Sequence, residues 1–299
     1  MSSRLLALLA ATAASVIYGI NHTIAKGLMP DIIGPFGFIL LRVLGAAILF
    51  WGCSLFFQNE KIDRSDWIRI LGCAFFGMVL NMTMFFKGLS LSTPINSSVV
   101  ITVAPVLLLV LSALFLKERI TLKKALGITL GLLGALSLIL FGLKTQPNAP
   151  NIPLGNALFL VNATSYSVYL IIVKPLVSKY NSITLMKFFF LFALIMNLPI
   201  GWNEFSEVNW TSLSIDSIWK MGFVVVGTTF LTYLLNIYAL KQLSPSVIGV
   251  FMYLQPLVAA IFALLVGADT ITPLRMLAAA LIFTGVYLTT RKTKKQPAP

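Results

Sequence analysis

Charged residues are scarce in this chain of 299 residues: they make up 10% of it, and only 9 of them are Asp or Glu. A soluble domain carries about 25% charged residues, and a compact body of this size needs such a polar surface to stay dissolved. Hydrophobic residues instead make up 58% of the sequence, and the mean hydropathy is +0.94. The scarcity of charge therefore excludes a soluble protein and indicates an integral membrane protein.

Cysteine and histidine are also scarce, with 2 cysteines and 1 histidine. Cys53 and Cys73 lie in apolar stretches, so the sequence supports neither a disulfide framework nor a CxxC metal site. His22 has no second histidine or carboxylate cluster at ligand spacing. A GxxxxGK[ST] phosphate loop is missing as well, so ATP cannot drive this protein directly. We therefore expect neither a metal ion nor a cofactor.

The net charge of +13 would suggest nucleic acid as a partner in a soluble protein. Here the positions of Lys and Arg predict orientation instead, because these residues are enriched in cytoplasmic loops. Most of them fall near span ends on the side that holds the N-terminus and the basic tail 291–295. We expect a multi-pass protein of the cytoplasmic (inner) membrane, with both termini in the cytoplasm and with the lipid bilayer, not nucleic acid, as its partner.

Ten apolar runs, bounded by turn residues or charges, follow one another along the chain. They fall at 5–26, 35–57, 67–87, 95–116, 123–143, 154–174, 183–202, 218–240, 246–266 and 274–290. A helix that crosses the hydrocarbon core needs about 20 residues, and a run such as 103–116 is apolar on every face, unlike a barrel strand. We therefore predict an all-α integral membrane protein with ten transmembrane helices. The first run could alternatively be a cleaved signal peptide, because Arg4 precedes it.

The chain also repeats itself, which favours a span over a signal peptide at its start. A shift of 148 residues places Tyr18 on Tyr166 and Lys26 on Lys174. A shift of 151 residues aligns each of six residues with an identical or similar one in the second half of the chain: Pro94, Pro105, Glu118, Ile120, Thr121 and Gly134. We therefore predict two five-helix halves, at 1–146 and 147–299.

An odd number of spans in each half has a further consequence. The second half must enter the membrane from the opposite side, so the two halves form an inverted repeat. Inverted repeats give many secondary transporters two similar conformations, each open to one side of the membrane, around a central site. The alternative is a gene duplication without transport.

Several motifs of both halves match a known pattern. They are Tyr18-Gly19 with Lys26, Pro35 with Arg42, Ala104-Pro105-Val106, Leu116-Lys117-Glu118-Arg119, the glycines 127, 131 and 134, Tyr166 to Lys174, Leu254-Gln255-Pro256-Leu257 and Gly285-Val286. With them the chain resembles the EamA family of the drug/metabolite transporter (DMT) superfamily, over about residues 5–290. The sequence Gly267-Ala268-Asp269 departs from a Gly-Glu pair that is common there. The resemblance implies a secondary transporter, with cargoes that include amino acids, other metabolites and drugs.

Polar residues inside the predicted spans are candidates for a substrate cavity, because burying them in hydrocarbon is costly unless they face water, a partner or a ligand. The candidates are Asn21, His22, Arg42, Asn81, Asn96, Ser97, Tyr166, Tyr169, Thr229, Tyr233, Asn236, Tyr253 and Gln255. Positions 228, 229, 232, 233 and 236 share one helical face by spacing, which a water-filled cavity would satisfy. The alternatives are hydroxyls that only bond neighbouring helices and rings that only pack.

Four of the intramembrane positions carry specific expectations. His22 would suit proton coupling, because a histidine changes its charge near neutral pH; alternatively, it is a neutral ring bonded between helices. Arg42 cannot be discharged and must find a carbonyl, a hydroxyl or a substrate carboxylate. Pro105 and Pro256, at equivalent points of the two halves, each remove one helix hydrogen bond, so we predict hinges there.

The favoured hypothesis is a secondary transporter that moves small organic metabolites, amino acids or related solutes, by alternating access, in the export direction. The alternatives are a non-transporting receptor or scaffold, a channel, a polyspecific drug exporter and an intramembrane enzyme. An enzyme is disfavoured because His22 has no GxSxG partner and no span carries an acid at its centre. The sequence leaves the substrate, the coupling ion, the resting conformation and the oligomeric state open.

Overall fold

Helices account for most of the structure, a computed structural model that describes residues 3–57, 60–116, 122–141, 145, 148–243, 251 and 254–290. The α-helices are α1 (Ser3–Lys26), α2 (Pro35–Ser54), α3 (Trp67–Ala74), α4 (Asn81–Leu91), α5 (Pro94–Ile101), α6 (Ala104–Leu116), α7 (Leu122–Leu140), α8 (Ile152–Lys179), α9 (Ser182–Ser206), α10 (Ile215–Gly222), α11 (Thr232–Gln242), α13 (Leu254–Leu265) and α14 (Pro273–Thr290). Two π-helical segments, η2 (Phe75–Leu80) and η4 (Phe223–Leu231), continue α3 into α4 and α10 into α11. Short 3-10 helices precede α3 (η1, Arg64–Asp66) and α10 (η3, Trp210–Ser212).

Six continuous helical segments are long and apolar enough to cross a membrane: Ser3–Lys26, Pro35–Ser54, Arg64–Leu91, Ile152–Lys179, Ser182–Ser206 and Ile215–Gln242. Shorter apolar helices lie at Pro94–Leu108, Ala125–Gly134, Leu254–Leu265 and Pro273–Gly285. All ten predicted runs therefore coincide with helices, although 142–143 of the fifth run and 246–250 and 252–253 of the ninth lie outside the described residues. The prediction of an all-α, multi-pass membrane protein is confirmed.

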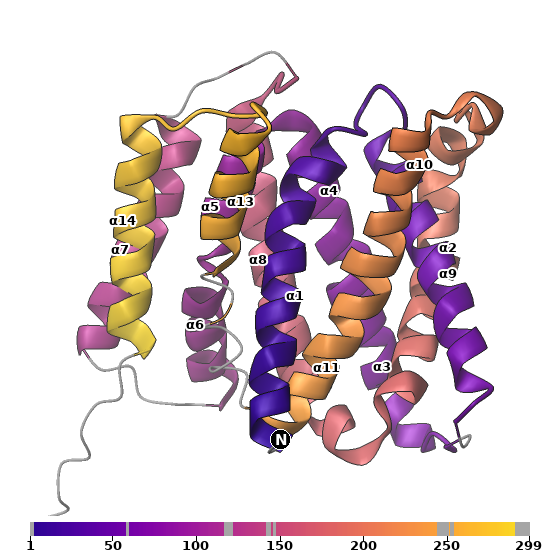
Figure 1. Cartoon of the computed structure of the whole chain (residues 1–299). Helices are drawn as coiled ribbons and strands as arrows, with labels where there is room; N and C mark the ends of the chain where they lie inside the picture. Colours follow the sequence, from indigo (N-terminus) through magenta and orange to yellow (C-terminus); the bar gives the residue numbers. More distant parts are fainter. Residues whose placement is uncertain are drawn as a thin grey trace, which may run out of the picture.

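The helices pack side by side into one bundle (Figure 1). α2 runs along α9, α4 along α8, and α1 lies against both α11 and α13. α7 and α14 form a pair at one edge of the bundle, and α2 and α9 stand at the opposite edge. The α7–α14 contact depends on glycine: a Cβ added to Gly285 would lie 2.5 Å from the carbonyl oxygen of Gly127. Small residues of this kind let membrane helices approach closely.

The beginning of α2 is fixed by a residue from another helix. Pro35 occupies its first turn, where a missing N–H costs nothing. The carboxylate of Glu204 on α9 accepts hydrogen bonds from the backbone N–H groups of Phe36 at 2.6 Å and Gly37 at 2.9 Å. A negative charge at a helix N-terminus also interacts favourably with the helix dipole. Glu204 therefore caps α2 and ties it to α9.

Three of the spans are irregular along their length. α5 ends at Ile101, residues Thr102 and Val103 form a turn, and α6 begins at Ala104, directly before Pro105. The two π-helical segments occupy equivalent places, since the shift that superposes Tyr18 on Tyr166 also superposes the first residue of η2 on that of η4. Pro105 therefore lies beside a helix break, and Pro256 is the third residue of α13; bending at either proline stays a prediction.

Candidate functional site

A cavity of about 80 Å³ lies inside the bundle and is called here the central cavity. Helices α1, α2, α4, α8, α11 and α13 all contribute to its wall, together with the break between α5 and α6. Its polar lining consists of Ser15, Tyr18, Asn21, His22, Arg42, Asn81, Asn162, Tyr166, Tyr233, Asn236 and Gln255. Its apolar lining consists of Met82, Phe85, Phe86, Ile101, Ala104 and Ala163.

Most of the cavity residues proposed from the sequence lie in this lining: Asn21, His22, Arg42, Asn81, Tyr166, Tyr233, Asn236 and Gln255. Asn96, Ser97, Tyr169 and Thr229 are buried but do not belong to the lining, and Tyr253 lies outside the described residues. Ser15, Tyr18 and Asn162 also belong to the lining but were not among the proposed cavity residues. The spacing could have found Tyr18 and Asn162, because each lies one helical turn before a proposed residue on the same face, and Ser15 lies two turns before His22.

Arg42 is the one side chain in the lining that carries a permanent charge, and it is 3% exposed. Its Nε donates a hydrogen bond to Thr229 Oγ1 on η4 at 2.7 Å, and its guanidinium lies 4.6 Å from the centre of the Phe86 ring. Within the described residues, no carboxylate pairs with Arg42 and its two Nη atoms donate no hydrogen bond. The cavity therefore contains unmatched donors in the planar fork that binds carboxylates.

The π-helical segments supply backbone acceptors around the cavity. Tyr233 Oη donates to the carbonyl oxygen of Gly77 at 3.0 Å, and Ser165 Oγ donates to that of Phe76 at 2.6 Å. Both carbonyls belong to η2, and such irregular turns often accompany functional sites. On η4, Thr229 accepts from Arg42 and donates to the carbonyl five residues earlier, that of Val224, at 2.7 Å. The irregular turns thus orient Tyr233 and Arg42.

His22 connects α1 to α5. Its Nδ1 lies 2.6 Å from Ser97 Oγ, and that hydroxyl donates its single proton to the carbonyl oxygen of Pro94 at 2.8 Å. With the hydroxyl proton directed at Pro94, Nδ1 is the donor to Ser97 Oγ, and this arrangement requires the tautomer that carries its proton on Nδ1. Phe85 packs edge-on against the imidazole, with 5.4 Å between ring centres. The expected bond between helices is present, and proton coupling stays a prediction.

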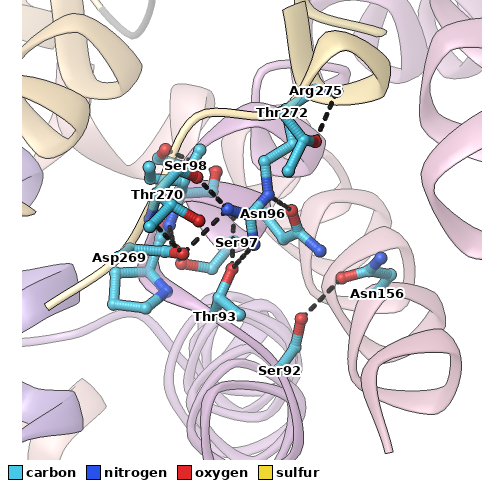
Figure 2. Close-up of polar contacts among 12 residues, drawn as sticks. Ser92, Thr93, Asn96, Ser97, Ser98, Asn156, Asp269, Thr270, Thr272 and Arg275 are labelled. Carbon is cyan, nitrogen blue, oxygen red and sulfur yellow. Dashed lines mark hydrogen bonds and ion pairs between the residues drawn. The ribbon is translucent and has the colours of Figure 1, made fainter. Parts of the chain in front are cut away.

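A second polar group (Figure 2) lies where α13 turns into α14, at one end of the bundle (Figure 1). Arg275, the third residue of α14, forms an ion pair with Asp269 at 2.8 Å. Arg275 Nε donates to Asn96 Oδ1 at 2.8 Å and Nη2 to Thr93 Oγ1 at 2.9 Å, while Asp269 accepts from the backbone N–H of Ile95 at 3.2 Å. Asn96, proposed as a cavity residue, thus contacts Arg275. We call Thr93, Asn96, Asp269, Thr270 and Arg275 the Arg275 cluster.

A larger cavity of about 700 Å³, called here the end cavity, lies beside this cluster. It is lined by the last turn of α1, the start of α5 and the end of α13, including Thr23, Lys26, Thr93 and Asp269. Lys26 Nζ donates to the carbonyl oxygens of Leu89 and Ser90 at 2.7 and 3.1 Å. No described residue lines both cavities, and no group of three potential metal ligands occurs in the described part of the chain.

Comparison with known proteins gives a family match over nearly the whole chain. The model of the EamA-like transporter family matches twice, at residues 5–140 and 153–291. The chain is 29% identical over 265 residues to an uncharacterized transporter of Archaeoglobus fulgidus, covering 89% of this chain and 90% of that protein. It is 25% identical over 292 residues to the uncharacterized transporter YetK of Bacillus subtilis, covering 95% and 86%.

A plant relative and a solved structure extend the comparison. The WAT1-related protein At1g43650 of Arabidopsis thaliana is 22% identical over 306 residues, covering 91% of this chain and 87% of that protein. A solved structure described as "Crystal structure of protein" superposes with a TM-score of 0.66 at 18% identity, over 96% of this chain and 97% of that one. At this identity the match shows a shared fold.

Proposed function

Because the chain belongs to the EamA-like transporter family, and is therefore a membrane transporter, we propose that it moves small organic metabolites, amino acids or related solutes, by alternating access. It is a secondary transporter of the cytoplasmic membrane with both termini in the cytoplasm, and export is the favoured direction. The relatives are named as transporters and not as enzymes. The observation that carries the substrate proposal is the unpaired Arg42 in the central cavity.

An unpaired guanidinium inside a membrane protein is expensive, because a charge at the centre of a membrane helix costs about 2.5–3.5 kcal/mol. Arg42 has a hydroxyl and a ring as neighbours but no counter-charge among the described residues. A carboxylate in the central cavity would supply that counter-charge and accept the free Nη donors in a bidentate arrangement. We therefore assign the carboxylate end of the solute to Arg42.

The central cavity also contains a hydrogen-bond acceptor for the other end of the solute. Asn21 Oδ1 is buried and has no hydrogen-bond partner in the described residues, and Asn21 lines the same cavity as Arg42. An amide oxygen without a donor is costly to bury, so a solute ammonium, a solute hydroxyl or water is needed there. Asn236 and Gln255 add further amides to the lining. This set of donors and acceptors fits an amino acid or a related small acid.

Alternating access is supported by contacts that recur in the two halves, which we take as 1–146 and 147–299. Lys26 Nζ binds the carbonyl oxygen of Leu89 at the end of α4, and Lys174 Nζ binds that of Leu240 at the end of α11. Lys174 is the repeat partner of Lys26, and the two halves match the same family model. An inverted repeat of this kind would build two similar conformations around the central cavity.

His22 is the group that we assign to proton coupling. Its Nδ1 is committed to Ser97, so a proton taken up at Nε2 would place a second positive charge in the central cavity beside the carboxylate site. Binding of the proton and of an anionic group would then favour each other through electrostatic attraction. A His22→Gln variant should keep substrate binding but lose the pH dependence of transport.

The test is solute flux in proteoliposomes that contain the purified protein. We expect counterflow of small amino acids or hydroxy acids, and Arg42→Gln should lower it by about tenfold or more, the loss that one charge-assisted bidentate contact implies. Arg69→Gln is the matched control, because Arg69 is half exposed and pairs with Asp66 away from the cavity. Binding without flux would favour a receptor, and an unchanged rate in Arg42→Gln would overturn the carboxylate assignment.

A further inference from the structure

The start of α5, residues 93–97, contacts the walls of both cavities. Thr93 and Pro94 line the end cavity. One turn later, Ser97 is hydrogen-bonded to His22, which lines the central cavity. The start of α5 is therefore bonded to the central-cavity wall on one side and borders the end cavity on the other. Displacing this segment would therefore alter the walls of both cavities.

The Arg275 cluster holds that segment from the second half of the chain. Asp269 and Arg275 belong to the second family match, whereas Thr93 and Asn96 belong to the first. Gly267 turns the chain after α13 with a φ of +65°, and Ala268 N–H bonds to the carbonyl oxygen of Ala263 at 2.8 Å. Glycine adopts this left-handed conformation without strain. The turn brings Asp269 to the first backbone N–H group of α5, that of Ile95.

The ion pair in the cluster is buried and its polar groups are matched. The Arg275 and Asp269 side chains are 5% and 1% exposed. Each nitrogen of the guanidinium donates to an acceptor, and Nη1 donates to two, Asp269 and the carbonyl oxygen of Thr270. A satisfied network of this kind is formed or broken as a unit, since removing one partner leaves a buried charge without compensation. It therefore has two discrete states rather than a gradual series.

We propose that the Arg275 cluster is a latch that closes the central cavity toward the end cavity. While it is formed, the two halves are joined across the start of α5, and solute in the central cavity cannot reach the end cavity. Opening toward that side requires Arg275 to leave Asn96 and Thr93. This proposal rests on the alternating access proposed above, but its test measures access to the cavity and needs no transported solute.

The test uses a cysteine reporter inside the central cavity. Cys53 and Cys73 are replaced by Ala, and Ala163→Cys places one thiol in the lining. A charged, membrane-impermeant thiosulfonate reagent is added to one side of sealed vesicles at a time. A second reporter, Ile271→Cys in the exposed α13–α14 turn, identifies the side on which the end cavity lies. With the cluster intact, we expect the Ala163→Cys thiol to react slowly from that side.

Breaking the latch should open one side only. Arg275→Gln and Asp269→Asn should each raise the labelling rate of Ala163→Cys from the end-cavity side by about tenfold or more, and leave the rate from the other side unchanged or lower. Arg275→Lys keeps the charge beside Asp269 but loses the fork, so it should give a smaller increase. Because this variant retains the ion pair, it also tests the proposal if Arg275→Gln fails to fold.

The matched control is Asp66→Asn. Asp66 pairs with Lys179 at 2.6 Å and lies beside the start of α3, at the opposite end of the bundle (Figure 1). It should leave labelling from the end-cavity side unchanged. An unchanged rate in the Arg275 and Asp269 variants, or an equal increase from both sides, would overturn the latch. Vesicles that label as expected but transport no solute would instead contradict the proposed function.

Discussion

Replacing Arg42 by Met should leave the stability of the ligand-free protein almost unchanged, whereas replacing Arg275 by Met should destabilise it strongly. Both arginines are buried and both belong to membrane helices. They differ in their counter-charge: Arg275 has the carboxylate of Asp269 at 2.8 Å, and Arg42 has no carboxylate partner in the described residues. The two substitutions therefore distinguish an arginine whose charge is retained for a ligand from an arginine whose charge is paired inside the fold.

The magnitudes follow from the contacts of each side chain. Arg42→Met loses a charged hydrogen bond to Thr229, about 1.5–3 kcal/mol, and a ring contact with Phe86 of about 0.5–2 kcal/mol. It recovers about 2.5–3.5 kcal/mol by removing a charge from the membrane interior, so the net change lies between a gain of about 1.5 kcal/mol and a loss of about 2.5 kcal/mol. Arg275→Met leaves Asp269 buried without a counter-charge, which costs about 3–5 kcal/mol.

Thermal unfolding of the purified protein, followed by tryptophan fluorescence, measures both effects. With about 2–4 °C per kcal/mol for chains somewhat shorter than this one, Arg275→Met should lower the midpoint by roughly 6 °C or more. The Arg42→Met midpoint should stay much closer to that of the wild type. A transported carboxylate should raise the wild-type midpoint by mass action but not that of Arg42→Met. Equal losses in the two variants would refute the claim that Arg42 is unpaired.

Three further substitutions test single contacts by the same thermal measurement. Glu204→Gln weakens the cap on the Phe36 N–H and should cost about 1 kcal/mol; an unchanged midpoint would show that α2 does not depend on it. Gly267→Ala meets no atom within 4 Å but must adopt a φ of +65°, so it should cost about 1 kcal/mol through the backbone alone, and a gain in stability would contradict this. Tyr233→Phe leaves the Gly77 carbonyl without its donor and should cost about 1–3 kcal/mol, whereas a neutral result would mean that water replaces the hydroxyl.

The sequence was sufficient to predict the helical spans and to single out Arg42, because a charged residue inside an apolar run can be recognised without knowing any tertiary contact. Arg275 was harder to interpret. It lies next to a polar turn at the start of a span, where Arg ordinarily reaches water. Its burial depends on the turn at Gly267, which places Asp269 and the start of α14 over α5. A tertiary contact of this kind has no local sequence signal.

Asn96 and Ser97 show a second limit of spacing arguments. They are neighbours in the sequence and were assigned together to the cavity. In the structure Ser97 bonds to His22 and Asn96 bonds to Arg275, because adjacent residues of a helix point about 100° apart. Because α5 has only eight residues, its polar pattern was too short to predict which face of the helix lines the cavity.

The two π-helical segments bear on the ancestry of the chain. A π turn contains one residue more than an α turn, and it persists mainly where function requires it. η2 and η4 begin at positions that the same shift superposes as it does Tyr18 and Tyr166. Inheritance from one ancestral half explains this coincidence with a single insertion, whereas separate origins require two. Each segment lies within one of the two matches of the same family model, so the predicted repeat of two five-helix halves accounts for both irregular turns with one insertion.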